Sequence, residues 1–131
     1  MAGVRVVTDS ACDLPQELVD RHAITIVPLS IRFGDEEYVD REELSAPAFY
    51  ERMARRDVLP QTAAPSPGAF QTAFRRLADE GADGIVCITL SGSLSATIEA
   101  ARAGAAAVGD DVPVRVIDSR SITMGLGTLC L

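Results

Sequence analysis

Tryptophan is absent from this sequence, and aromatic residues of all kinds make up only 5% of it. The core must therefore be built from aliphatic side chains. These are plentiful, because 47% of the residues are hydrophobic, and that proportion excludes an intrinsically disordered chain. A length of 131 residues suits a single domain, which we expect to span residues 1–131.

Basic residues are also fewer than acidic ones, at 12 against 19. The formal net charge is −7 at pH 7, so the chain offers no basic face of the kind that binds a nucleic-acid backbone. The densest basic cluster comprises Arg52, Arg55 and Arg56. These arginines stand among acidic residues, as on a solvated helix face, and we therefore expect no nucleic-acid partner.

Cysteine is rare, and its pattern suggests no cross-link. The three cysteines are Cys12, Cys87 and Cys130, an odd number without a C-x-x-C pair. This argues against both a disulfide framework and a zinc site. Cys87 lies in an apolar segment, where we expect it to act as a small buried hydrophobic residue.

Targeting, membrane and nucleotide motifs are missing too. The N-terminus has no basic segment followed by an apolar stretch, and no apolar run approaches the roughly 20 residues of a membrane-spanning helix. Neither a Walker loop nor a G-x-G-x-x-G motif is found. We therefore expect a cytoplasmic protein with no membrane span and no cofactor.

What the sequence does contain is an alternation of strand and helix patterns. Apolar or β-branched runs predict strands at 4–8, 24–33, 37–39, 84–90 and 114–117. Helical patterns lie between them and predict helices after 13, over 45–55, after 66, over 94–107 and within 121–131. This alternation predicts an α/β fold, with a mostly parallel sheet covered by helices on both faces.

Local signals mark where several elements begin or break. Asp13 and Ser45 are candidate N-caps, and Ser66-Pro67 predicts an N-cap followed by the first residue of a helix. Pro28 indicates a break within the second strand region, and the proline-rich stretch 57–67 is expected to be a connection. The helix after Pro67 carries three large apolar residues on one face: Phe70, Phe74 and Leu77.

Three predicted strands end in short polar segments: Thr8-Asp9-Ser10, Ser91-Gly92-Ser93 and Asp118-Ser119. In parallel sheets, ligands bind at the carboxyl ends of the strands. Thr62, in the loop before a helix, could be brought to the same edge.

Four hydroxyl side chains, those of Ser91, Ser93, Ser95 and Thr97, lie within seven residues of one another. One interpretation is a nucleophile, since the run from Gly92 to Ala96 resembles the elbow motif G-x-S-x-G with Ser93 at its centre. A serine nucleophile needs a general base. The only histidine, His22, precedes the serine, which is the wrong chain order for that fold.

The second interpretation is an anion cradle. Where a strand gives way to a helix, the first backbone N–H groups are unpaired and the helix dipole favours negative charge. Hydroxyl groups add donors that rotate to suit a ligand. Such a site holds a carboxylate or phosphate without a base. The third interpretation is that Ser93 or Ser95 merely caps the helix. Four hydroxyls beside other polar strand ends favour the cradle.

Carboxylates at the strand ends could in principle hold Mg²⁺. The segment from Asp9 to Asp13 does not have the spacing of a metal-binding loop, and Asp13 is explained by capping. We expect Asp9 and Asp118 to orient loops by accepting hydrogen bonds from backbone N–H groups, and we expect no metal.

Taken together, five blocks of sequence resemble the DegV family. Residues 7–15 (VTDSACDLP) resemble T-D-S-x-x-D-L-P, residues 62–68 (TAAPSPG) resemble T-S-Q-P-S-P-G, and residues 88–97 (ITLSGSLSAT) resemble I-x-I-S-S-x-L-S-G-T. The other two blocks are 26–30 with 38–40, and 116–119 with 124–127. The resemblance covers essentially the whole chain.

The resemblance implies a lipid-binding protein of the bacterial cytoplasm that has no catalytic residue of its own. In the characterised branch of the family, the protein holds a long-chain fatty acid and presents its carboxylate to a fatty acid kinase, which makes the acyl phosphate from ATP. The family's carboxylate-binding Thr and Ser match Thr62 and Ser95.

The resemblance and the cradle together define the expected site. Its further ligand-binding residues are Ser91, Gly92, Ser93 and Thr97. Three other polar residues are expected to hold these in position without contacting the ligand: Asp9, Ser10 and Asp118. The sequence departs from the family pattern at three places: Gly92, Ala96 and Ala63-Ala64. Each departure changes a local donor or the backbone freedom beside the site.

Family members are about twice as long, with a second domain that helps to enclose the acyl chain. The resemblance therefore implies an N-terminal domain whose chain stops in the connecting helix near 121–131. Such a truncated domain would expose apolar surface and could self-associate. Two alternatives stay open: a serine hydrolase built on Ser93, and an interaction fragment that binds no small molecule.

Overall fold

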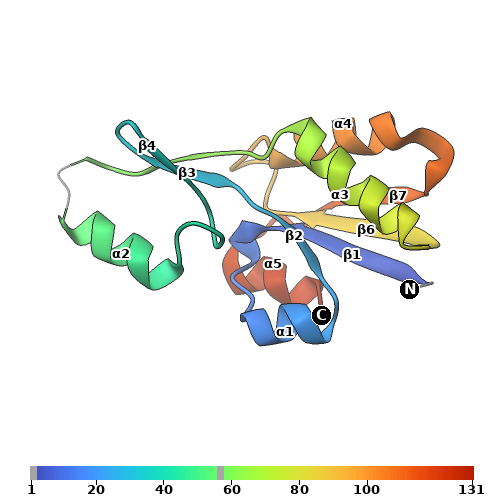
Figure 1. Cartoon of the computed structure of the whole chain (residues 1–131), viewed down its shortest axis with the longest axis horizontal. Coiled ribbons are helices and arrows are strands. Elements are labelled where there is room, and N and C mark those ends of the chain that lie inside the picture. The colour runs from blue at the N-terminus through green and yellow to red at the C-terminus, as the bar shows by residue number, and fades with distance from the viewer. Residues whose placement is uncertain (1–2, 56–57) are drawn as a thin grey trace.

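The computed structural model describes residues 3–55 and 58–131 of the chain (Figure 1). Its centre is a four-stranded sheet of β1 (Val4–Asp9), β2 (Thr25–Val27), β6 (Gly84–Thr89) and β7 (Val114–Asp118), in the order β2-β1-β6-β7. All three strand pairs are parallel. Parallel pairing brings the carboxyl ends of the strands to one edge, where the polar segments of the sequence lie.

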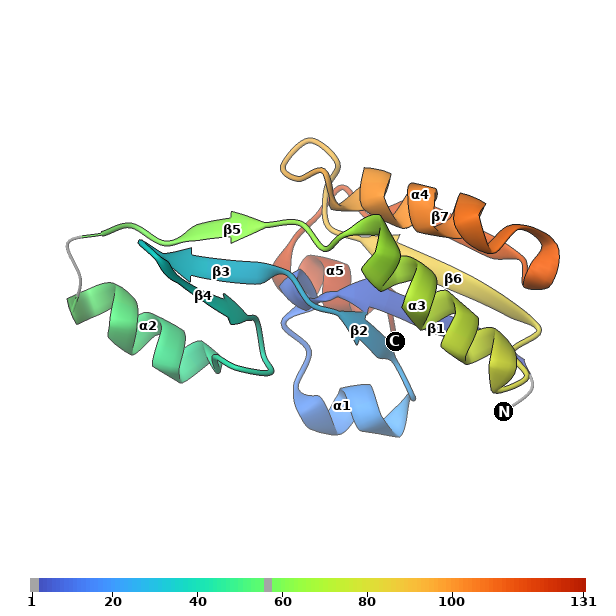
Figure 2. The same cartoon turned by 45° about the horizontal axis from the view of Figure 1, so that its top comes forward.

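Helices cover both faces of this sheet (Figures 1 and 2). On one face lie α3 (Pro67–Asp79) and α4 (Thr97–Val108). On the other lie α1 (Gln16–Arg21), α5 (Thr123–Leu129) and the short 3-10 helix η1 (Ser10–Cys12). A second 3-10 helix, η2 (Gly109–Asp111), follows α4. The predicted α/β fold with a mostly parallel sheet is confirmed.

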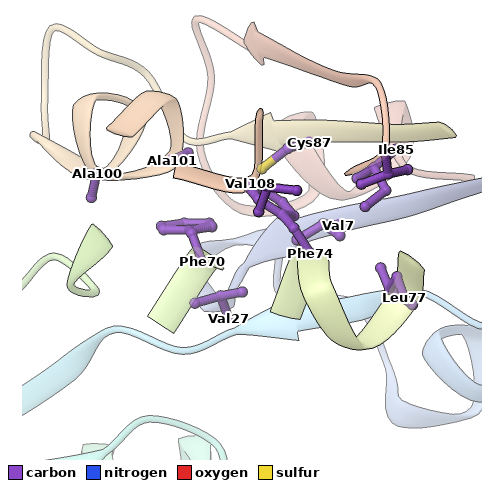
Figure 3. Close-up of a cluster of buried hydrophobic side chains, with 11 residues drawn as sticks. Val7, Val27, Phe70, Phe74, Leu77, Ile85, Cys87, Ala100, Ala101 and Val108 are labelled. Carbon is purple, nitrogen blue, oxygen red and sulfur yellow. The ribbon is translucent and has the colours of Figure 1, made fainter. Parts of the chain in front are cut away.

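The core between the sheet and helices α3 and α4 is aliphatic apart from two phenylalanines and Cys87 (Figure 3). The expected face of α3 is confirmed, since Phe70, Phe74 and Leu77 are all buried there. They pack against side chains of the sheet and of α4 that include Val7, Val27, Ile85, Cys87 and Ala101. Cys87 is the small buried hydrophobic residue that we expected, and its burial raises the pKa of the thiol to about 12.

The opposite face has its own core of buried residues, formed by Cys12, Leu14, Val19, Ile24, Leu29, Ile88, Leu90, Leu126 and Cys130. All three cysteines are buried and free. Helix α5 approaches η1 so closely that a Cβ at Gly127 would clash with the carbonyl oxygen of Cys12. This contact explains the glycine, because a larger residue would force the two segments apart.

A second, smaller unit projects from the sheet (Figures 1 and 2). We call it the arm. It consists of an antiparallel sheet of β3 (Ser30–Phe33), β4 (Glu36–Val39) and β5 (Gln61–Ala63), in the order β4-β3-β5, and of α2 (Ala46–Arg55). Among its described residues, the buried core consists of Ile31, Phe33 and Leu44.

Most of the predicted boundaries in and near the arm are confirmed. The region 24–33 breaks at Pro28 into β2 and β3, and 37–39 lies within β4. The side chains of Ser45 and Ser66 accept hydrogen bonds from the N–H groups of Ala48 and Ala69, as N-caps do. Arg56, and the first residue of the stretch 57–67, lie outside the described residues.

Three predictions were wrong in detail. The stretch 57–67 is not only a connection, because residues 61–63 form β5 by pairing with β3. Asp13 does not cap α1; it adopts a left-handed conformation with φ of 51° after η1, and Pro15 is the N-cap residue of α1. Helix α4 begins at Thr97 rather than at Leu94, because Leu94 and Ser95 both donate backbone hydrogen bonds to the Ser91 carbonyl in a turn.

Candidate functional site

The four hydroxyls of the predicted cradle form two pairs in the structure. We call residues 91–97 the hydroxyl loop. The Oγ atoms of Ser91 and Ser93 lie 2.8 Å apart, as do Ser95 Oγ and Thr97 Oγ1. Each pair is also held to the backbone, since Ser93 N–H donates to Ser91 Oγ and Thr97 N–H donates to Ser95 Oγ. The hydroxyls are therefore positioned by the loop itself.

The hydroxyl loop leads directly into the N-terminus of α4. The N-cap residue is Ala96, which has no side chain able to accept a hydrogen bond. Within residues 3–55 and 58–131, the N–H groups of Ala96 and Ile98 have no hydrogen-bond acceptor. Unpaired amides and the positive end of a twelve-residue helix together favour an anion at this point.

Asp118, at the end of β7, supports the hydroxyl loop from the side. Its two carboxylate oxygens accept from Gly92 N–H at 3.1 and 3.2 Å, and Oδ1 accepts from Arg120 N–H at 2.8 Å. These hydrogen bonds lower the pKa of Asp118. A Cβ at Gly92 would lie 2.8 Å from Asp118 Oδ2, so a side chain at this position would displace the Asp118 carboxylate from the hydroxyl loop.

A second loop, residues 119–122, is joined to the hydroxyl loop by the backbone. Ser91 N–H donates to the carbonyl of Ser121 at 2.9 Å. Ser119 Oγ in turn accepts from Ser121 N–H at 3.1 Å. The sequence could place Asp118 and Ser119 at this edge, but the contribution of Ser121 was missed because it depends on a contact between residues 30 positions apart.

Asp9 lies behind the hydroxyl loop and is completely buried. Its Oδ2 accepts from Leu90 N–H at 2.8 Å and its Oδ1 from Ala11 N–H at 2.9 Å, so the carboxyl group joins the ends of β1 and β6. Burial outweighs these hydrogen bonds and raises the pKa of Asp9 to about 6. The predicted roles of Asp9 and Asp118 as loop-orienting residues are confirmed.

Two further hydroxyls near this edge are buried. Ser10 Oγ accepts from Leu29 N–H at 3.0 Å and so fixes the segment between β2 and β3. Thr89 is fully buried, and its Oγ1 has no hydrogen-bond partner within residues 3–55 and 58–131. Since alternate residues of a strand face the same side, Thr89 lies on the α3 and α4 side with Cys87. Sequence reasoning did not single out Thr89, because its pattern is that of an ordinary β-branched strand residue.

Thr62 lies in the arm, on β5, and is exposed. A hollow of about 120 Å³ beside it is lined by residues of all three strands of the arm, among them Ser30, Arg32, Glu37 and Gln61. Helices α3 and α4 both begin at the carboxyl edge of the parallel sheet, so β5 and the hydroxyl loop approach that edge (Figure 2). No hydrogen bond joins Thr62 to the hydroxyl loop among the described residues.

Comparison with known proteins identifies the relatives of this chain. A sequence model described as "Uncharacterised protein, DegV family" matches residues 3–131. The chain belongs to the DegV family. A DegV domain-containing protein of Streptomyces coelicolor is 40% identical over 128 residues, which are 98% of this chain and 44% of that protein. The chain thus spans less than half the length of this DegV relative.

Solved structures of DegV proteins match the fold closely. DegV from Bacillus subtilis, described as a fatty acid binding protein, has a TM-score of 0.91 and 31% identity, covering 98% of this chain and 45% of that one. A stearic acid-binding protein from Eubacterium ventriosum has a TM-score of 0.88 and 33% identity, covering 96% and 44%. The α/β fold described above is therefore that of the DegV family.

The structure also bears on the elbow interpretation of Ser93. His22 is exposed at the end of α1, and the adjacent Ala23 carbonyl accepts from Arg5 near the start of β1. Ser93 follows the carboxyl end of β6. The histidine therefore lies at the opposite edge of the sheet from the serine, an arrangement that does not favour a Ser-His pair in this DegV chain.

Neither a metal cluster nor a membrane-spanning helix is found in the described parts of the chain. Over residues 3–55 and 58–131, no three His, Cys, Asp or Glu side chains gather in a way that could hold a metal ion. None of the helices in the same residues is both long and apolar enough to cross a bilayer.

Proposed function

We propose that this chain binds a long-chain fatty acid and holds its carboxylate at the carboxyl edge of the parallel sheet. Thr62 and Ser95 would donate hydrogen bonds to the carboxylate, with help from Ser91, Ser93 and Thr97. The observation that carries this proposal is the hydroxyl loop. It places the exposed Ser93, the half-buried Ser95 and the buried Ser91 and Thr97 at the start of α4, beside amides that have no acceptor among the described residues.

The relatives support the chemical class of the ligand. The Bacillus subtilis and Eubacterium ventriosum structures are described as fatty-acid-binding and stearic acid-binding proteins, and both superimpose on this fold. A carboxylate suits the site, because it accepts several hydrogen bonds from neutral donors and is attracted to a helix N-terminus.

The parts of the site contribute differently to binding. Burial of the alkyl tail would supply most of the affinity, at about 0.8 kcal/mol for each buried CH₂ group. The hydroxyls would fix the orientation of the head group. Since Gly92 N–H is already bonded to Asp118, Gly92 would act by shaping the hydroxyl loop rather than by donating to the ligand.

The tail needs more room than the arm offers. The hollow of about 120 Å³ beside Thr62 is smaller than the roughly 300–1,000 Å³ of typical small-molecule sites. The DegV relatives extend well beyond the aligned part, which is 44% of the Streptomyces coelicolor protein. A longer DegV chain would therefore have additional residues available to enclose the tail.

The proposal includes presentation of the carboxylate to a fatty acid kinase in the cytoplasm. The chain would supply no catalytic group; it would hold the head group at an exposed edge, where Ser93 and Ser95 are accessible to a partner. The kinase would transfer phosphate from ATP to a carboxylate oxygen, giving the acyl phosphate and ADP.

The test compares two ligands that differ only in charge and head group. Oleic acid and oleyl alcohol are titrated against the wild type, against the Thr62→Ala, Ser95→Ala double variant, and against Thr72→Ala, which removes an exposed hydroxyl of α3. We expect the double variant to bind oleic acid about tenfold more weakly or worse, because hydrogen bonds to a charged group contribute about 1.5–3 kcal/mol. Oleyl alcohol should be affected much less.

The outcomes separate the parts of the proposal. Native mass spectrometry should show an oleic acid adduct on the wild type and on Thr72→Ala. If the wild type binds no fatty acid, the proposed function is wrong for this chain. If the double variant binds oleic acid as tightly as Thr72→Ala does, the assignment of Thr62 and Ser95 is wrong.

A further inference from the structure

We propose that Arg120 is a further ligand-binding residue, whose guanidinium offsets the charge of Asp118 and attracts the fatty acid carboxylate to the hydroxyl loop. This inference rests on the function proposed above and adds a charged contact to a site otherwise made of hydroxyls and amides. It is drawn from the position of Arg120, from its lack of a partner, and from the electrostatics of the edge.

The backbone fixes Arg120 beside the hydroxyl loop. Asp118, two residues earlier, accepts from the N–H groups of both Gly92 and Arg120. Ser121, one residue later, accepts from Ser91 N–H at 2.9 Å. Arg120 therefore lies between two residues that are bonded directly to the hydroxyl loop.

The backbone at Arg120 is also in an uncommon conformation. Its φ of 53° lies in the left-handed region, as does that of Thr123 three residues later. Non-glycine residues adopt this region at a cost, and for a β-branched residue such as Thr123 the conformation is exceptional. Strain of this kind concentrates at functional sites, where the surrounding contacts hold it in place.

The side chain of Arg120 has no fixed partner. It is exposed and forms no hydrogen bond or ion pair with the rest of the described chain. Arg102 on α4, whose charge also helps to lower the pKa of Asp118, pairs with Glu99 at 2.8 Å. Among the described arginines, the other one without such a contact is Arg115, on β7. Arg120 is thus a free cation at the candidate site of a chain whose net charge is −7.

The positive charge of Arg120 counteracts a negative charge at the site. Asp118 is negatively charged and lies against the hydroxyl loop, so by itself it would repel a carboxylate that approached Ser93 or Ser95. Arg120 lies close enough to help lower the pKa of Asp118, together with the backbone hydrogen bonds. A guanidinium offers planar, paired donors that suit a carboxylate, and it stays charged at any relevant pH.

The experiment measures charge recognition rather than binding alone. Oleic acid and oleyl alcohol are titrated against the full chain as wild type, Arg120→Ala, Arg120→Lys and Arg115→Ala, at low and at high salt. The last variant is the matched control, because it also removes an exposed arginine without a partner. Thermal unfolding of each variant is recorded alongside.

We expect Arg120→Ala to weaken oleic acid binding about tenfold at low salt, as the loss of one charged contact predicts. High salt should reduce the difference, and Arg120→Lys should recover part of it. Oleyl alcohol binding should not change, because the alcohol carries no charge. Arg115→Ala should bind both ligands like the wild type.

Two results would overturn the inference. Equal oleic acid affinity in Arg120→Ala and Arg115→Ala would show that Arg120 makes no contact with the ligand. An equal loss of oleic acid and oleyl alcohol binding in Arg120→Ala would show a structural role only. Failure of the wild type to bind oleic acid would instead refute the proposed function, and this inference with it.

Discussion

The parallel sheet and the arm differ in how they are buried. The sheet has a core on each face, and helix α3 alone contributes three fully buried side chains. In the described part of the arm, one face of a three-stranded sheet packs on a core of three buried residues, and helix α2 contributes no buried residue to it. Because burial of apolar surface is the main favourable contribution to folding, the arm should open at a lower free energy than the sheet.

Because of this difference, one part of the proposed site belongs to the more stable sheet and the other part belongs to the less stable arm. Ser95 belongs to the hydroxyl loop, which is tied to β1, β6 and β7 through Asp9 and Asp118. Thr62 belongs to the arm, where β5 is held by pairing with β3. The spacing between the two proposed carboxylate ligands would therefore depend on how well the arm is folded.

The largest expected effect comes from truncating the core of the parallel sheet. Phe74→Ala should lower the free energy of unfolding by about 3–5 kcal/mol, since it removes a fully buried ring of α3 and leaves a cavity. The measurement is urea unfolding followed by far-ultraviolet circular dichroism. If the free energy of unfolding fell by less than 1 kcal/mol, the core of the parallel sheet would not be the main source of stability that we infer.

The companion variant is Phe33→Ala in the arm. The only two tyrosines are Tyr38 on β4 and Tyr50 on α2, and there is no tryptophan, so tyrosine fluorescence reports on the arm. Phe33→Ala should shift the fluorescence transition to lower urea and leave the circular dichroism transition nearly unchanged. Coincident shifts of both transitions would show that the two regions unfold as one unit.

The next largest effect is a pH dependence that belongs to the parallel sheet. The pKa of Asp9 is about 6 in the folded chain, against an ordinary value of 3.8. The folded state therefore holds the proton to higher pH than the unfolded state, so stability from this group is present below about pH 4 and is lost as the pH rises through 6. The loss should be roughly 3 kcal/mol, from about 1.4 kcal/mol for each pKa unit.

Urea unfolding between pH 4 and pH 7 measures this slope. Asp9→Asn should be less stable at low pH and should lose the extra slope over this range. Phe33→Ala should keep the slope, because Asp9 joins β1 and β6 and does not belong to the arm. A slope unchanged in Asp9→Asn would assign the pH dependence to another group.

The smallest of the three effects concerns the contact between α3 and α4. A Cβ at Gly104 would lie 2.8 Å from Phe70 Cβ and 2.9 Å from the Pro67 carbonyl oxygen, so Gly104→Ala should cost about 1–3 kcal/mol through overpacking. Gly68→Ala is the control, since its nearest neighbour would be Ser66 Oγ at 3.8 Å. Because alanine favours helix, Gly68→Ala should be neutral or stabilising by up to about 1 kcal/mol. Equal destabilisation by both changes would exclude close packing as the cause.

Sequence reasoning succeeded where the signal was local. Apolar runs predicted β1, β6 and β7, helical spacing predicted the buried face of α3, and Ser66-Pro67 marked its first turn. It failed where a partner far along the chain decides the outcome. Residues 61–63 carry no strand pattern of their own and become β5 because β3 lies beside them. Asp13 had the spacing of a cap, but η1 already places it in a left-handed conformation.

By itself, the sequence determined the α/β class, the aliphatic core, and the gathering of polar strand ends at one edge, because these follow from periodicity and from the rules of parallel sheets. Only the tertiary structure decided which of those polar groups form hydrogen bonds with one another. It buried Asp9, set Asp118 against Gly92, joined Ser91 to Ser121, and left the Arg120 side chain without a partner among the described residues. The physical reason is that hydrogen bonds and desolvation act between residues that only the folded chain brings together.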